Sequence, residues 1–351
     1  MRITANQVTF ARLVFMPFLG LMVYGDWRIQ IAGVVFGTML GCTDFIDGYL
    51  ARKHGPTILG GLMDPIADKV FIAVGFLPYA DLGWVPWWMI ALLFLREFLI
   101  TALRSSFELR QRTLATSYLA KVKTWFQMVG MGLLLLAVAV SSHSTLCWVL
   151  GALAAGPVAA WIVYRLATGK AWHGALIGCA GLTPVFLLEA LAGRTWLIWG
   201  IMICVLGITW ISGLDYLSLG IRELARSRRA LAADWVRLAG AIALPFGAVA
   251  TLTHVAVPAW PIIVLVAVEL AHGGLDNLLA HYQTTMAPWA WGVRVLGAGA
   301  CLGAALLVPD HAQALVYLAL GQTIVWGTCE FVRKRRFYLE VNLREKKAQT
   351  A

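Results

Sequence analysis

Long apolar runs alternate with short polar stretches along almost the whole chain. A helix needs ~20 predominantly apolar residues to cross the hydrocarbon core of a bilayer. Most of the apolar runs reach that length, so we expect an all-α polytopic membrane protein. The predicted spans are 8–25, 29–50, 65–81, 84–104, 120–141, 146–164, 174–191, 195–217, 236–256, 259–280, 289–307 and 312–332.

The polar stretches between the predicted spans carry most of the Lys and Arg residues, and they do so on one side. If the N-terminus is cytoplasmic, only Arg28 and Arg194 lie outside, which agrees with the positive-inside rule. The segments that are then inside are 52–64, 104–121, 165–173, 221–237, 281–288 and the tail from 333.

Composition supports the membrane interpretation, and it affects how the net positive charge is interpreted. The 351 residues are 60% hydrophobic and 13% charged, with a mean hydropathy of +0.76, which excludes an ordinary soluble domain. A net charge of +10 could indicate a nucleic-acid partner, but the basic residues fall in short clusters between spans. We therefore predict a lipid bilayer as partner, with anionic headgroups as a further attraction, and no nucleic acid.

One stretch breaks the apolar pattern with four carboxylates, between the apolar runs 29–43 and 70–80. A charged side chain at the centre of a bilayer costs ~2.5–3.5 kcal/mol, so such residues need a functional reason. Helical spacing places Asp44 with Asp47, and Asp64 with Asp68, on shared faces. Two helix ends can therefore present four carboxylates to one point, which is a site suited to a hard divalent cation and a substrate phosphate.

This stretch resembles the signature of the CDP-alcohol phosphotransferases, D-x2-D-G-x2-A-R-x8-G-x3-D-x3-D. One departure is visible, because seven residues rather than eight separate Arg52 from Gly60. A solvated acidic turn between two spans would need only polarity and not this spacing. The matching positions are Asp44, Asp47, Gly48, Ala51, Arg52, Gly60, Asp64 and Asp68.

Two later segments resemble the phosphatidylglycerophosphate synthase branch of that family. The first is R-E-x3-T-x2-R from Arg96 to Arg104, and the second runs from Ala120 to Gln127 and resembles G-K-x-K-T-x2-Q with Ala120 for glycine. Charge-assisted hydrogen bonds from a basic cluster would bind an acceptor phosphate. Positive-inside topology alone and mutual neutralisation of a buried Arg–Glu pair remain the plainer alternatives. The predicted phosphate-binding residues are Arg104, Arg110 and Lys121, with Lys123 beside them.

The segment before the first span, from Asn6 through Thr9 to Arg12, resembles the N-x-x-T-x-x-R segment of many family members, with Ala5 in place of their proline. Asn6 could equally be a helix N-cap and Arg12 a cytoplasmic anchor. The residues leave both alternatives open.

The resemblance implies a six-helix phosphotransferase core within residues 1–220, with an extra hairpin at about 143–192. Residues 221–235 read as a basic interfacial linker. About four extra transmembrane helices follow within 236–332, before a basic cytoplasmic tail at 333–351. The C-terminal helices echo the signature only at Asp276 and Ala280, and chance explains this better than a decayed second copy. Stabilisation, oligomerisation and regulation stay open as roles for this region.

The resemblance also implies a reaction: transfer of a phosphatidyl group from CDP-diacylglycerol to glycerol 3-phosphate, giving phosphatidylglycerophosphate and CMP. One or two Mg²⁺ or Mn²⁺ ions would bind the four aspartates, and Asp68 would also be the general base. The nucleotide would lie against Gly48, Ala51, Arg52 and Gly60. Members of the family commonly form homodimers in the cell (inner) membrane, with the active site facing the cytoplasm.

Three alternatives remain open from the sequence. The acceptor could be inositol phosphate, phosphatidylglycerol or serine rather than glycerol 3-phosphate. An ion-coupled membrane transporter also uses intramembrane carboxylates, although it would bury them near the bilayer midplane. An inactive scaffold would release no CMP.

Overall fold

The computed structural model confirms an all-α architecture, and it describes residues 4–55, 57–110, 118–170, 172–226, 232–282 and 289–338. Each predicted span corresponds to one long helix of the described residues, although 8–25, 84–104, 120–141, 236–256 and 289–307 extend one to three residues beyond the helix ends. The helices are α1 (Ala5–Val23), α2 (Trp27–His54), α3 (Ile58–Asp81), α4 (Trp87–Glu108), α5 (Tyr118–Ala139), α6 (His143–Thr168), α7 (His173–Ala192), α8 (Arg194–Arg226), α9 (Ala232–His254), α10 (Ala259–His281), α11 (Ala290–Leu307), η1 (Pro309–His311), α12 (Ala312–Arg333) and α13 (Arg335–Tyr338).

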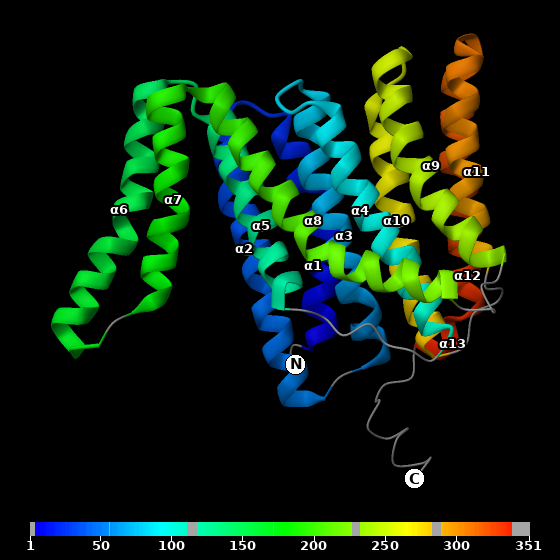
Figure 1. Ribbon diagram of the computed structural model, residues 1–351, viewed down its shortest axis with the longest axis horizontal. Helices are drawn as coiled ribbons and strands as arrows, with labels where there is room; N and C mark the ends of the chain where they lie inside the picture. Colours follow the sequence, from blue (N-terminus) through cyan, green and yellow to red (C-terminus); the bar gives the residue numbers. More distant parts are fainter. Residues whose placement is uncertain are drawn as a thin grey trace.

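The long helices run up and down, so that their connections alternate between the two ends of the bundle (Figure 1). In the described part of the chain, 10 helices are long and apolar enough to cross a membrane. The protein is thus an integral, multi-pass membrane protein. α3 and α4 are not among those 10, because charged residues such as Asp68, Lys69, Arg96 and Glu97 interrupt their apolar runs.

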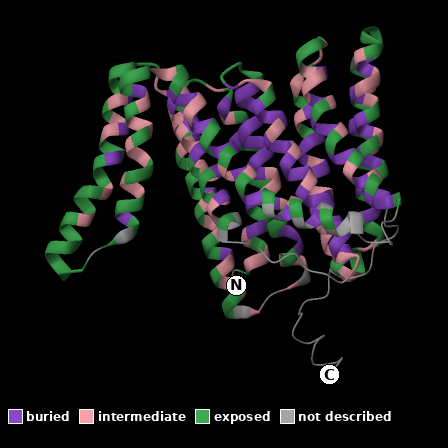
Figure 2. Ribbon diagram, viewed as in Figure 1, coloured by how far each residue is buried: buried purple, intermediate pink, exposed green. Residues whose placement is uncertain are grey.

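The buried core is continuous from the N-terminal helices into the C-terminal ones (Figure 2). Phe76 of α3, Phe98 of α4 and Met202 of α8 belong to the same cluster as Leu265 of α10 and Val295 of α11. α10 packs along α3, and α9 packs along α4. The four C-terminal helices therefore belong to the same packed body as the helices that carry the signature.

The hairpin of α6 and α7 is joined to the body at one end and stands apart from α2 at the other (Figure 1). Buried Glu189 of α7 makes the junction, since it lies 3.3 Å from Nη2 of Arg194 and 3.0 Å from Nδ1 of His143. Arg194 also donates to the carbonyl oxygen of Ala137 at the end of α5. Most other side chains of the hairpin are exposed, as expected for helices that face lipid.

The break between α2 and α3 sets the geometry of the signature. α2 ends at Gly55, whose φ of 97° is in the left-handed region that favours glycine. Thr57 then caps α3, because its hydroxyl accepts a hydrogen bond from the Gly60 amide at 2.9 Å. The two halves of the signature consequently lie on adjacent helix ends.

Candidate active site

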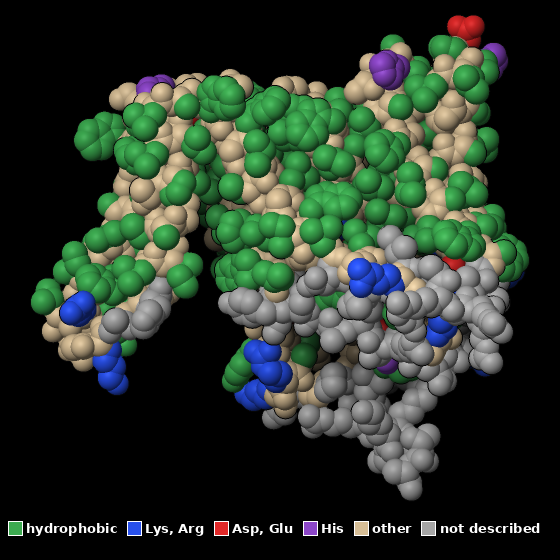
Figure 3. Space-filling view, viewed as in Figure 1, with side chains coloured by type: hydrophobic (Ala, Val, Ile, Leu, Met, Phe, Trp, Pro, Cys, Tyr) green, Lys and Arg blue, Asp and Glu red, His purple; other side chains and the backbone are tan. Residues whose placement is uncertain are grey.

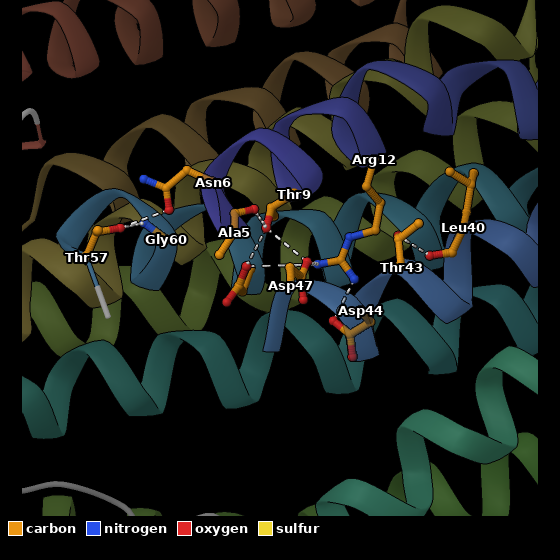
Figure 4. A network of polar contacts seen from close by, with 11 residues as sticks. Ala5, Asn6, Thr9, Arg12, Leu40, Thr43, Asp44, Asp47, Thr57 and Gly60 are labelled. Atoms are coloured by element: carbon orange, nitrogen blue, oxygen red, sulfur yellow. Dashed lines mark hydrogen bonds and ion pairs between the residues drawn. The ribbon is translucent and has the colours of Figure 1, made fainter. Parts of the chain in front are cut away.

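α1 holds the aspartates of α2 and α3 together (Figure 4). The Thr9 hydroxyl lies 2.9 Å from Oδ2 of Asp47 and 3.1 Å from Oδ1 of Asp64. The Arg12 guanidinium lies 2.6 Å from Oδ1 of Asp44 and 3.4 Å from Oδ2 of Asp47. Three of the four predicted carboxylates, from two helices, therefore meet around one threonine and one arginine, and Asp68 makes no hydrogen bond or ion pair with this group in the described structure.

These carboxylates differ in their access to solvent. The side chain of Arg12 is 2% exposed and that of Asp47 is 5% exposed, whereas Asp44 and Asp64 are 43% and 52% exposed. Three carboxylates share one guanidinium here, so negative charge is in excess. Two of the three carboxylates thus keep oxygens that a ligand can reach.

The donor set of this cluster fits a hard divalent cation, because it consists of carboxylate oxygens with an excess of negative charge. Among the described residues, no group of three or more His, Cys, Asp or Glu side chains is close enough to hold a metal ion. The Arg12 guanidinium lies between Asp44 and Asp47 and offsets the repulsion between their carboxylates, as a bound metal ion would. The chemistry of the site therefore fits a metal, while the closest carboxylate contacts are made by Arg12 and Thr9.

The structure settles the alternatives for the segment before the first span. Thr4, and not Asn6, is the N-cap of α1, in a capping box with Gln7. Asn6 instead accepts a hydrogen bond from the Thr57 hydroxyl at 2.9 Å. A Cβ added to Gly60 would lie 2.9 Å from Oδ1 of Asn6, so glycine permits this close contact between α1 and α3. Arg12 is buried at the aspartates and does not face a membrane surface.

Asp68 faces a second feature, a cavity of about 250 Å³ beside the aspartate cluster. Its carboxylate interacts electrostatically with Arg12 of the aspartate cluster and with Lys123 of the cavity lining. Asp68 therefore connects the aspartate cluster to the cavity. Other polar residues lining the cavity are Lys69, Arg96, Glu97, Thr101, Arg104, Lys123, Thr124, Gln127, Tyr216 and Asn277.

Ion pairs organise the far wall of this cavity. Glu97 accepts a hydrogen bond from Nζ of Lys123 at 2.9 Å and from Nη1 of Arg96 at 3.2 Å. Nε of Arg96 also donates a hydrogen bond to the Thr209 carbonyl oxygen at 3.0 Å. Glu97 thus neutralises part of the positive charge of the cavity lining. The lining also contains Lys69, Arg96, Arg104 and Lys123, so its cations outnumber Glu97.

The residues predicted to bind the acceptor phosphate do not all lie in one place. Arg104 lines the cavity, and its buried Nε has no hydrogen-bond partner in the part of the chain that the structure describes. Arg110 lies elsewhere, with Nη1 donating to Asp234 of α9 at 3.2 Å and to the Ser106 carbonyl oxygen at 2.6 Å. The side chain of Lys121 lies outside the described residues. Lys123 does line the cavity.

The predicted nucleotide-binding residues lie at the end of α2 and the start of α3. A Cβ added to Gly48 would meet only Nη1 of Arg52, at 3.5 Å, so the backbone there is open to a ligand. Ala51 is half-buried and the Arg52 side chain is exposed. Gly60 follows on α3, where its contacts are with Asn6 and Thr57. These residues therefore surround the aspartates without meeting at one point.

Sequence reasoning missed two cavity residues. Lys69 directly follows the signature, and its Nζ donates to the Thr101 hydroxyl at 2.9 Å. Helical periodicity could have found it, since the residue after Asp68 points toward a neighbouring face. Asn277 comes from α10, more than fifty residues beyond the expected core, and no local signal marks it.

Comparisons with known proteins agree with the signature. A sequence model of the family described as CDP-alcohol phosphatidyltransferase matches residues 2–167. The CDP-diacylglycerol--glycerol-3-phosphate 3-phosphatidyltransferase of Bacillus subtilis (strain 168) is 30% identical over 145 residues, which are 37% of this chain and 75% of that protein. This chain belongs to the CDP-alcohol phosphatidyltransferase family.

Other relatives place the chain nearest the phosphatidylglycerophosphate synthase branch, as its motifs predicted. A probable phosphatidylglycerophosphate synthase of Mycobacterium tuberculosis (strain ATCC 25618 / H37Rv) is 37% identical over 144 residues, covering 40% of this chain and 68% of that protein. A CDP-diacylglycerol--glycerol-3-phosphate 3-phosphatidyltransferase of Rickettsia bellii (strain RML369-C) is 34% identical over 136 residues, covering 37% of this chain and 74% of that protein. No solved structure gives a significant match.

Family membership makes the protein a transferase of phospholipid biosynthesis, and enzymes of this family generally use a divalent metal ion. The family match ends within α6. The helices beyond it, including α10 with Asn277, must therefore be interpreted from their own contacts.

Proposed function

We propose that this enzyme transfers the phosphatidyl group of CDP-diacylglycerol to glycerol 3-phosphate, giving phosphatidylglycerophosphate and CMP. The observation that carries the proposal is the cavity in which the Asp68 carboxylate lies together with Lys69, Arg104 and Lys123. A phosphorylated alcohol needs cations for its phosphate and a base for its hydroxyl, and this cavity offers both.

The four aspartates are the proposed metal ligands. Asp44, Asp47, Asp64 and Asp68 would hold one or two Mg²⁺ or Mn²⁺ ions, which when bound would neutralise charge on the diphosphate. Arg12 and Thr9 position these carboxylates and limit their repulsion. Gly48, Ala51, Arg52 and Gly60 would form the neighbouring nucleotide-binding surface, with the exposed Arg52 side chain free to reach a phosphate.

Asp68 is the proposed general base. Its carboxylate would take the proton of the acceptor hydroxyl as the oxygen attacks phosphorus and CMP leaves with the electrons of the broken P–O bond. Among the residues that the structure describes, Asp68 makes no hydrogen bond that would occupy its oxygens. Its carboxylate interacts electrostatically with Arg12 and Lys123, so it would lie between a diphosphate bound at the aspartates and an acceptor bound in the cavity.

Arg104 and Lys123 are the proposed ligands of the acceptor phosphate, supported by Lys69. Arg104 suits this role best, because it lines the cavity and its buried Nε is unpaired in the described structure. Lys121 remains a proposed ligand from its motif. Arg110 is engaged with Asp234, and we assign it a supporting role at the α4–α9 contact.

We further propose that the site faces the cytoplasm from the cell (inner) membrane. Up-and-down helices bring the ends carrying Arg52, Arg104, Arg165, Arg222 and Arg333 to one side of the bundle. On the face shown in Figure 3, Lys and Arg side chains gather toward that side. The positive-inside rule makes this the cytoplasmic side.

Residues 1–220 would then form the phosphotransferase domain, residues 221–235 a linker and 236–332 a supporting membrane region. Homodimerisation is proposed from the family.

The test is CMP release by the purified protein in lipid nanodiscs with CDP-diacylglycerol and Mg²⁺. Acceptors would be supplied singly: glycerol 3-phosphate, inositol phosphate, phosphatidylglycerol and serine. We expect CMP release and a phosphatidylglycerophosphate product with glycerol 3-phosphate only. Release with serine or phosphatidylglycerol instead would overturn the proposed acceptor. An absence of CMP with every acceptor, from protein that is folded and binds CDP-diacylglycerol, would overturn the proposed function.

A further inference from the structure

The acceptor cavity is completed by a residue from the C-terminal helices. α3, α4, α5 and α8 supply all of its lining residues except Asn277, which comes from α10. The family match ends before α10 begins. The C-terminal helices are therefore part of the wall of the site and not an appendage beside it.

Two glycines let α10 approach this closely. A Cβ added to Gly273 would lie 2.6 Å from Cγ2 of Thr101, a cavity residue, and one added to Gly274 would lie 3.3 Å from Cγ1 of Ile66. Small residues at a helix contact allow the backbones to come together. Asn277 follows one turn later and so reaches the cavity between α3 and α4.

Hydrogen bonding fixes the orientation of the Asn277 amide. The Ser105 hydroxyl donates to Oδ1 of Asn277, so the NH₂ group is left to donate. Within the described structure, that NH₂ group has no partner. Next to it, Asp276 forms an ion pair with Arg237 of α9 at 3.0 Å, and both side chains are buried. This ion pair holds α10 at the rotation that presents Asn277.

We infer that Asn277 determines acceptor specificity by donating hydrogen bonds to an oxygen of the phosphorylated alcohol bound beside Asp68. The inference rests on the proposed function and extends it to a residue outside the family's matched region. Cations of the cavity attract any anion, whereas an oriented amide donor is directional and recognises an oxygen at one position. The ligand class is a small alcohol that carries a phosphate.

The test compares kinetic constants of the full-length Asn277→Asp variant with those of the wild type. This change keeps the shape of the side chain but replaces two donors with a negative charge. We expect the KM for glycerol 3-phosphate to rise about ten- to hundredfold, while the KM for CDP-diacylglycerol is unchanged. The matched control is Gln322→Glu, which makes the same chemical change on α12, where the amide donates to the Arg294 carbonyl oxygen at 3.4 Å. Its KM values should equal those of the wild type.

A binding measurement without turnover gives a second readout. Glycerol 3-phosphate should raise the Tm of the wild type and of Gln322→Glu, but not of Asn277→Asp. If Asn277→Asp does not fold, Asn277→Ser replaces it, with an expected several-fold rise in the same KM. An unchanged KM, or a lower Tm and kcat with no change in KM, would overturn the inference. Failure of the wild type to use glycerol 3-phosphate would instead overturn the proposed function, and the KM comparison would then use the acceptor that does react.

Discussion

Charged side chains are buried at two places in this molecule, and the two places are built differently. At the aspartate cluster, Arg12 is sealed from solvent but Asp44 and Asp64 are about half exposed. Within the C-terminal helices, Arg294 pairs with Glu269 at 3.0 Å, and both side chains are 0% exposed. The first cluster is open on one side, and the second is closed.

The closed cluster pairs its charged side chains with one another. Arg294 also lies 3.3 Å from Glu330, and the Thr323 hydroxyl donates to Glu269 at 2.7 Å. Such a network holds helices in register, but removing one partner is costly because it leaves a buried charge unpaired. In the aspartate cluster, three carboxylates share one guanidinium, and oxygens remain for a ligand. Carboxylates outnumber the guanidinium in both clusters, so exposure to a ligand, and not the presence of buried ions, distinguishes the candidate site.

The largest expected effect is on the chemistry at the open site. Replacing Asp68 by Asn keeps the shape of the side chain but removes the proposed base, so kcat should fall by about 10²–10⁴-fold. The free energy of unfolding should change little, because Asp68 makes no ion pair within 4 Å in the described structure. Measured CMP release and thermal unfolding would check both parts. Equal CMP release from variant and wild type would remove Asp68 from the mechanism.

The next effect is on stability at the closed cluster. Replacing Arg294 by Met leaves Glu269 and Glu330 buried without their cation, and should lower the free energy of unfolding by about 3–5 kcal/mol. Replacing exposed Arg28 by Met is the control, with an expected change within about 0.5 kcal/mol. Denaturant unfolding in mild detergent measures both. A loss of similar size in the two variants would show that the closed cluster has no special energetic role.

A smaller effect distinguishes Arg104 of α4 from Arg110, which lies just beyond the end of that helix. Replacing Arg104 by Ala removes a cavity cation and should raise the KM for glycerol 3-phosphate by about tenfold or more. Replacing Arg110 by Ala removes its ion pair with buried Asp234, so it should lower the Tm without changing that KM. Steady-state kinetics and thermal unfolding separate these outcomes. The reverse assignment, with the KM effect at Arg110, would place the acceptor phosphate near α9.

The smallest effect compares one glycine from each region. A Cβ at Gly292 would lie 2.8 Å from the backbone nitrogen of Arg237, so Gly292→Ala should destabilise the C-terminal helices by about 1–3 kcal/mol. A Cβ at Gly61 would meet nothing within 4 Å. Gly61→Ala should therefore be neutral or slightly stabilising, because alanine favours a helix. Equal Tm values for the two variants would contradict the tight packing of α9 against α11.

Sequence alone predicted what depends on local spacing. The positions of Asp44, Asp47, Asp64 and Asp68 follow from helical periodicity, and apolar length gave the order of the long helices. These features need only the period of one helix and the thickness of a bilayer.

Contacts between distant helices could not be predicted in this way. Arg12 meets Asp44 across 32 positions, and Arg110 meets Asp234 across 124, so neither pair leaves a local pattern. Asn277 reaches the cavity only because Gly273 and Gly274 bring α10 against α3 and α4. Thr9 and Arg12 belong to a sequence motif, but the aspartates that they contact could be identified only from the structure.

The most direct test of the contrast between the open and closed clusters pairs two isosteric changes, Asp64→Asn and Glu269→Gln. CMP release from CDP-diacylglycerol with glycerol 3-phosphate is measured per folded molecule, alongside the Tm of each variant. We predict that Asp64→Asn loses CMP release at a nearly unchanged Tm, whereas Glu269→Gln has a lower Tm and normal CMP release. Normal release from Asp64→Asn together with loss of release from folded Glu269→Gln would contradict the account, because it would place the chemistry in the closed cluster.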